Sequence, residues 1–180
     1  MSVPTASPNS YSSKVNERAC QITDPRMCVR ASIDIAEHAE LSLSGCDSSE
    51  VLDEAKAIIH LARRWLAGRI GYAKAVEQML AHALAENSAI DSDVWNYYLA
   101  TCCLAWMISE VRERSDQPER LAQIAQKTRS AVTSAADKGP GYGSCWAAEG
   151  DWQVKYLERL LGLCADLCVG DRLRNSLLAS

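Results

Sequence analysis

The sequence predicts an all-α protein, a single bundle of about six helices that follows a flexible N-terminal arm. Three observations lead to this prediction. Ala and Leu, which are strong helix formers, dominate the apolar residues of the 180-residue chain, and Phe is absent. Apolar residues recur at the 3.6-residue helical period in successive segments. No segment shows the alternation of apolar and polar residues that is typical of a half-buried strand.

The length and composition indicate one globular domain. A chain of 180 residues can bury a sizeable core, and 48% hydrophobic with 23% charged residues is typical of a folded protein rather than a disordered one. Residues 1–23 are rich in Ser, Pro and Asn and show no clear period. We therefore expect a flexible N-terminal arm over residues 1–23 and the helical bundle over residues 24–180.

The first expected helix begins at Asp24 and Pro25 and runs to about Leu43. Asp is a good N-cap, and Pro is tolerated in the first turn because its missing N–H would have no helical partner there. Gly45 then ends the helix.

The second and third expected helices follow closely. The second opens with Asp47 and Glu50, which have the spacing of a capping box, and Gly68 ends it. The third covers about residues 72–86. The apolar stripe of the second helix consists of Val51, Ala55, Ile58, Ala62 and Trp65, and that of the third consists of Val76, Met79, Leu80, Ala83 and Leu84.

Three longer segments complete the expected bundle. The fourth helix begins near Ser92 and is apolar nearly all round over residues 97–108, which predicts a central position. The fifth has Pro118 in its first turn and ends before residues 139–141. The sixth covers about residues 144–169, with Cys164 and Cys168 on its apolar face, and a short last helix follows Asp171.

Charge and hydropathy exclude several classes of partner. The net charge is −4 and the pI is near 5.4, without the basic stripe that phosphate binding requires, so we expect no nucleic-acid partner. The longest apolar run, Leu99 to Ile108, is far shorter than the roughly 20 residues of a membrane span. The first 13 residues lack the basic start and apolar core of a secretory signal. We therefore expect a cytoplasmic protein that does not enter a membrane.

The eight cysteines indicate reduced thiols rather than a disulfide framework. Most of them lie within helical apolar patterns, where free Cys behaves as a small buried hydrophobic residue. Disulfide frameworks are typical of short, loop-rich secreted chains, which this sequence does not resemble.

An acidic run is the most informative charge pattern. Between Ala31 and Ala55 there are seven carboxylates and no Lys or Arg, a distribution that could steer a basic partner toward the first two expected helices. The alternative is a solvated face whose charges have no partner protein. The candidate partner-binding residues are Asp34, Glu37, Glu40, Asp47, Glu50, Asp53 and Glu54.

Two weaker patterns suggest chemistry. Cys145 is predicted at a helix N-terminus, a position that favours the reactive thiolate, although an inert structural thiol fits the same pattern. Asp34 and His38 are four residues apart on one helix face, as two metal ligands could be. His60 lies among cationic neighbours, which indicates a solvated surface. Because no complete metal-binding or phosphate-binding motif is present, we expect no metal and no cofactor.

Two stretches resemble a known group of proteins. The first is Arg63-Arg64-Trp65-Leu66-Ala67-Gly68, which follows an Ala-rich run and the segment Ala36-Glu37-His38. The second is Ala148-Glu149-Gly150-Asp151-Trp152-Gln153. Together they resemble all-helical bacterial proteins assigned as immunity proteins of toxin systems, over roughly residues 26–162. The His-bearing, Ala-rich middle of that group is replaced here by residues 95–108.

Two functional hypotheses follow. The first is a non-enzymatic protein-binding module, an immunity-type neutraliser of a basic partner, which is what the resemblance and the acidic run imply. The alternative is a small helical enzyme, or a ligand- or metal-binding protein, that uses Cys145 or the Asp34/His38 pair. The sequence sets no oligomeric state.

Overall fold

The computed structural model describes residues 8–43, 50–84, 92–111, 117–136 and 145–162. Helices dominate these residues and no strand occurs among them, which confirms the all-α prediction. The described part holds seven helices rather than about six. They are α1 (Pro8–Ala19), α2 (Pro25–Leu43), α3 (Glu50–Leu66), α4 (Tyr72–Ala83), α5 (Ser92–Ser109), α6 (Gln117–Ala136) and a helix over residues 145–162.

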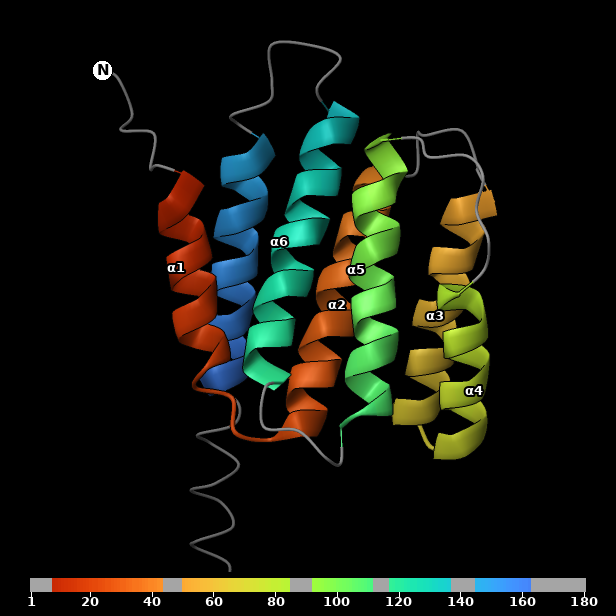
Figure 1. Ribbon diagram of the computed structural model, residues 1–180. Helices are drawn as coiled ribbons and strands as arrows, with labels where there is room; N and C mark the ends of the chain where they lie inside the picture. Colours follow the sequence, from red (N-terminus) through yellow and green to blue (C-terminus); the bar gives the residue numbers. More distant parts are fainter. Residues whose placement is uncertain (1–7, 44–49, 85–91, 112–116, 137–144, 163–180) are drawn as a thin grey trace, which may run out of the picture.

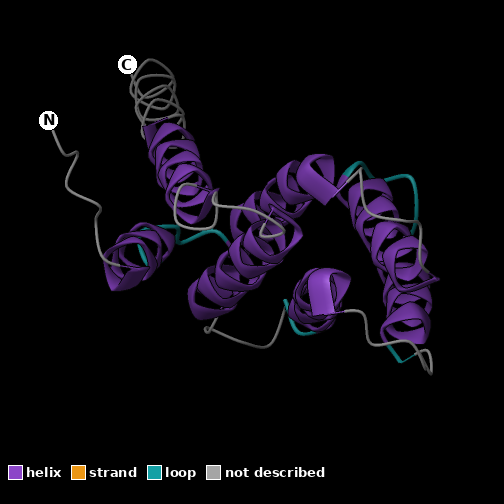
Figure 2. Cartoon of the chain, turned by 90° about the horizontal axis from the view of Figure 1, so that it is seen from above, coloured by secondary structure: helices purple, strands orange, loops and turns teal. Residues whose placement is uncertain are grey.

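The helices stand side by side, with their axes roughly upright in Figure 1. The 145–162 helix, drawn in blue, and α1 form one edge, and α3 and α4 form the other. The view from above in Figure 2 shows the same arrangement. Helices α2, α5 and α6 lie between the two edges, and α6 packs against α1, α2 and α5.

Helix α1 corrects the expectation of a flexible arm. Its residues Tyr11, Val15 and Ala19 are buried, and so is Ile22 just after it. The first three are four residues apart, so they share one helix face, which turns toward α6. This short apolar stripe was not recognised from the composition, because the segment around it is rich in Ser and Asn. Residues 1–7 lie outside the described part of the chain.

The ends of α2 and α3 follow the predicted signals where these are described. The carboxylate oxygen Oδ1 of Asp24 accepts the backbone N–H of Arg26 at 2.8 Å, which caps α2. After α3, Gly68 adopts a positive φ of 69°, and the N–H of Arg69 reaches the carbonyl of Arg64 at 2.8 Å. The predicted signals at Gly45 and Asp47 lie outside the described residues.

Helix α5 is central, as its apolar sequence predicts. It contacts α2, α3, α4 and α6, and Tyr97, Leu104 and Ile108 are buried. Only Trp106 among its large apolar side chains is well exposed, at 42%. The aromatic side chains of Tyr97 and Tyr98 are therefore part of the core.

Helix α4 ends at Ala83, so Leu84 is 67% exposed rather than buried with Met79. The expected C-terminal part of the sixth helix, with Cys164, Cys168 and the helix after Asp171, lies outside the described residues.

Candidate functional site

The predicted partner-binding carboxylates come from two adjacent antiparallel helices. Helix α2 supplies Asp34, Glu37 and Glu40, and α3 supplies Glu50, Asp53 and Glu54; Asp47 lies outside the described residues. Because the helices run in opposite directions, the last turn of α2 lies beside the first half of α3. The carboxylates therefore fall into two groups, one near the middle of α2 and one toward this end of the helix pair.

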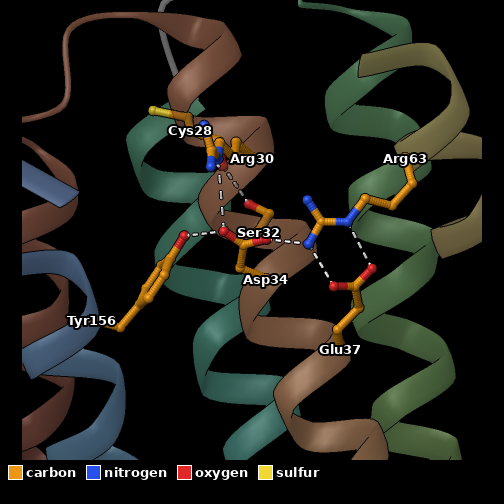
Figure 3. A network of polar contacts seen from close by, with 7 residues as sticks. All are labelled: Cys28, Arg30, Ser32, Asp34, Glu37, Arg63 and Tyr156. Carbon is orange, nitrogen blue, oxygen red and sulfur yellow. Dashed lines mark hydrogen bonds and ion pairs between the residues drawn. The ribbon is translucent and has the colours of Figure 1, made fainter. Parts of the chain in front are cut away.

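In the first group, Arg63 of α3 binds Asp34 and Glu37 (Figure 3). Its Nε donates to Oε1 of Glu37 at 2.7 Å, and its Nη2 pairs with Oε2 of Glu37 and with Oδ1 of Asp34. The hydrogen bond to Glu37 raises the pKa of Arg63 above its usual value, despite partial burial. One guanidinium thus offsets two of the predicted carboxylates.

Asp34 also joins α2 to the 145–162 helix. The hydroxyl of Tyr156 donates to Oδ2 of Asp34, and Nε of Arg30 lies 3.9 Å from the same oxygen (Figure 3). Burial, followed by this hydrogen bond, raises the pKa of Tyr156 above its usual range. Asp34 therefore has partners on three helices, so its role is to hold them together.

In the second group, two carboxylates have partners and remain partly exposed. Oε1 of Glu40 lies 3.8 Å from Nζ of Lys56, and the hydroxyl of Tyr97 donates to Oε2 of Glu40 at 3.5 Å. Burial, then the charge of Glu40, raises the pKa of Tyr97 above its usual range. Glu54 pairs with Nδ1 of His82 on α4.

Glu50 and Asp53 are exposed in the first turn of α3. Their negative charges interact favourably with the positive end of the helix dipole at this N-terminus. We call Glu40, Glu50, Asp53 and Glu54 the acidic end of the α2–α3 pair. Glu50 and Asp53 are exposed at this end, whereas Asp34 and Glu37 are only partly exposed and are bound by Arg63.

The Asp34/His38 pair does not form a metal site. Asp34 binds Arg63 and Tyr156, whereas Nδ1 of His38 lies 3.1 Å from Oε2 of Glu149. This is an ion-pair distance, but the direction at the ring nitrogen is not that of a hydrogen bond. Among the described residues, no three His, Cys, Asp or Glu side chains gather where they could hold a metal ion.

His38 also stacks on aromatic residues of the 145–162 helix. Its ring lies 3.5 Å from that of Trp152, with 9° between the planes, and Trp152 stacks on Tyr156 at 5.3 Å. These stacking contacts hold the imidazole of His38 against the 145–162 helix. His38 is thus a packing residue with a charged partner.

A buried polar cluster lies between α6 and the 145–162 helix. The side-chain amide nitrogen of Gln153, fully buried, lies within hydrogen-bond distance of three acceptors: the carbonyl of Ala125 at 2.9 Å, the hydroxyl of Thr128 at 3.3 Å and Oε1 of Glu149 at 3.1 Å. Glu149 is 4% exposed. Burial raises the pKa of its carboxyl, and His38, Gln153 and Arg129 oppose that shift.

Arg129 supplies the cation of this cluster from within α6. It is 0% exposed, and its guanidinium carbon lies 4.7 Å from the ring centre of Trp146. Burial lowers the pKa of Arg129, while the charge of Glu149 raises it. Together Arg129, Glu149 and Gln153 connect the 145–162 helix to the rest of the bundle.

Cys145 is the first described residue of the 145–162 helix and is half-buried. The five cysteines of the described residues are free thiols. Burial raises the pKa of Cys28 to about 12 and that of Cys102 to about 11, so both thiols stay protonated at neutral pH.

Sequence reasoning missed the partners of the predicted residues. Arg63 and Glu149 lie in the two stretches that carry the family resemblance, but nothing in their spacing reveals that they face α2. In the sequence, Arg129 stands directly beside residues of the apolar stripe of α6. A charged residue in such a position usually extends its side chain to solvent. Its burial could not be read from the sequence.

Comparison with known proteins adds no identification. No protein-family model matches the sequence, and the searches of curated proteins and of solved structures gave no match either. None of the described helices combines the length and the apolar character needed to cross a membrane.

Proposed function

We propose that this protein is a non-enzymatic binding module that captures a basic protein partner, in the manner of an immunity protein. The acidic end of the α2–α3 pair supports the proposal. Glu50 and Asp53 are exposed there, beside the partly exposed Glu40 and Glu54. Clustered carboxylates facing solvent accelerate the approach of a basic partner and favour it over an acidic one.

The structure narrows the set of residues that a partner would meet. Asp34 and Glu37 are engaged by Arg63, so a partner would have to break those bonds to use them. The acidic end requires no such rearrangement at Glu50 and Asp53. Leu41, 74% exposed in the last turn of α2, offers apolar contact area beside Glu40.

The test is capture of basic proteins from lysate of the source cells by immobilised protein. The site variant carries Glu50→Lys and Asp53→Lys. The matched control carries Glu77→Lys and Glu119→Lys, which reverse two exposed carboxylates on α4 and α6 and change the net charge equally.

We expect the wild type and the control to retain one basic protein in stoichiometric amount, and the site variant to lose at least 90% of it. Equal capture by all three proteins, or no basic protein retained by the wild type, would contradict the proposed function. Circular dichroism of the three proteins checks that the helices are intact.

A further inference from the structure

The exposed charges of the α2–α3 pair are segregated along its length. At one end lie the carboxylates of the acidic end. At the opposite end lie four exposed arginines, Arg26, Arg30, Arg64 and Arg69, which we call the basic end. The guanidinium of Arg26 lies 6.0 Å from the ring centre of Trp65, which places the first turn of α2 beside the last turn of α3.

Helix dipoles do not explain this segregation. In α3, carboxylates in the first turn and arginines in the last turn suit the dipole. In α2 the order is reversed, because Arg26 lies in the first turn and Glu40 in the last. Each end thus gathers charges of one sign from two helices, which repel one another within a single chain. The contacts of Lys56 with Glu40, of His82 with Glu54 and of Asp34 with Arg30 offset only part of this repulsion.

Like charges that repel one another within one chain are stabilised when they lie against opposite charges on a second chain. We propose that two copies of this protein associate through their α2–α3 faces about a two-fold axis, with the acidic end of each copy against the basic end of the other. A two-fold axis across the face reverses its direction, so both charge contacts form at once and the assembly closes at two copies.

The outward stripe of α3 fits such an axis. Glu50, Asp53, His60 and Arg64 are exposed and share one side of the helix, and the half-buried Ala57 lies at its centre. Glu50 and Arg64 are each seven residues from Ala57, so antiparallel pairing sets Glu50 against Arg64 of the second copy. Asp53, four residues before Ala57, then lies close to His60 of the second copy, three residues after Ala57. The small side chain of Ala57 allows the two helices to approach closely at the axis.

The size of the face predicts a weak dimer. A helix of this length is about 25 Å long, and a pair of helices is about 20 Å wide, which gives about 500 Å² per copy. That is less than the about 800 Å² per partner of a standard interface. Because its contacts are mainly ionic and exposed, we expect the association to weaken as salt is added.

This inference goes beyond the proposed function and does not depend on it. The dimer covers the acidic end, so a basic partner would compete with the second copy for Glu50 and Asp53. Reversing the basic end abolishes the dimer but leaves these carboxylates in place. Partner capture and self-association can therefore be separated by mutation.

The test is sedimentation equilibrium of the full chain, without any partner, at low and high salt. The first variant carries Glu50→Lys and Asp53→Lys, and the second carries His60→Glu and Arg64→Glu. Each variant alone sets like charges against each other. An equimolar mixture of the two restores opposite charges at both contacts.

We expect wild-type dimers at low salt that dissociate with added NaCl, a monomer for each variant, and dimers again in the mixture. Rescue by mixing cannot come from variants that fail to fold. Wild type that stays monomeric, dimers that survive both reversals, a mixture that stays monomeric, or association that continues beyond two copies would each overturn the proposal. A monomeric wild type that binds heparin through Arg64 would instead assign the basic end to an anionic polymer.

Discussion

Two clusters of charged side chains bind the helices together in different ways. The Asp34–Arg63 cluster joins α2, α3 and the 145–162 helix near the surface, where Asp34 is 22% and Arg63 37% exposed. The Glu149–Arg129 cluster joins α6 and the 145–162 helix inside the protein, where the two residues are 4% and 0% exposed. The same kinds of charge therefore act in different surroundings, and burial decides how much the fold depends on them.

The reason is the loss of water. A charge that stays near solvent keeps most of its hydration when its partner is removed, so the pair contributes little. A buried charge without its partner keeps the full cost of dehydration. We therefore expect mutations in the two clusters to differ in effect although the residues are alike.

The largest effect is expected from Glu149→Ala. Removing this carboxylate takes away a charge that favours the buried cation of Arg129 and an acceptor of the buried Gln153 amide, which should lower the free energy of unfolding by about 3–5 kcal/mol. Urea unfolding followed by circular dichroism measures it. The control Glu158→Ala removes an exposed carboxylate from the same helix and should change stability by less than about 1 kcal/mol. Similar losses from both variants would contradict the comparison.

The next effect is expected from Gly150→Ala, which tests how α1 packs on the buried cluster. A Cβ at Gly150 would lie 2.8 Å from the ring of Tyr11, so either helix α1 or the Tyr11 ring must shift. Such overpacking costs about 1–3 kcal/mol. Gly162→Ala, where a Cβ meets no atom within 4 Å, is the control and should be neutral or slightly stabilising. An unchanged unfolding midpoint for Gly150→Ala would mean that α1 does not pack there.

A smaller effect is expected from Arg63→Lys in the surface cluster. Lysine keeps the charge but cannot make the forked contact with Glu37 and Asp34, so stability should fall by about 1 kcal/mol or less. The loss should shrink between 0.05 M and 0.5 M NaCl, because exposed ion pairs are screened. A loss as large as that of Glu149→Ala, or one that salt leaves unchanged, would show that the surface cluster behaves like the buried one.

The smallest effect is expected in the dependence of stability on pH. Burial raises the pKa of Glu149, so the folded state binds this proton more tightly than the unfolded chain does. The stability that this proton provides is complete below the unfolded pKa of about 4.3 and is lost as pH rises through the raised pKa. The stability of the wild type relative to Glu149→Gln should therefore improve as pH falls from 7 to 4. A difference that is constant with pH would contradict it.

Much of the fold was predictable because helix signals are local. Pro25 and Asp24 set the start of α2, and the apolar run of residues 97–108 set α5 at the centre. Helix α1 was missed because its stripe of Tyr11, Val15 and Ala19 is short and lies within a polar segment. Its stability comes from packing against α6 rather than from its composition.

The candidate site was predictable only in part. The acidic run identified Glu50 and Asp53, which are exposed as a partner would require. The acidic run also included Asp34 and Glu37 as candidate partner-binding residues, because a count of charges carries no information on which side chains lie next to them in space. Their partners come from α3 and from the 145–162 helix, 26–29 and 122 residues away along the chain.

The sequence by itself determined the all-α class, the position of most helices and the location of the acidic run, since each depends on residues within a few turns of one another. Only the tertiary structure decided which charges meet. Antiparallel packing of α2 and α3 set Arg63 against Asp34 and Glu37 and gathered like charges at both ends of the pair. Docking of the 145–162 helix on α6 buried Arg129 and Glu149. The physical reason is that electrostatic free energy depends on distance and burial, and both are fixed only when distant segments pack.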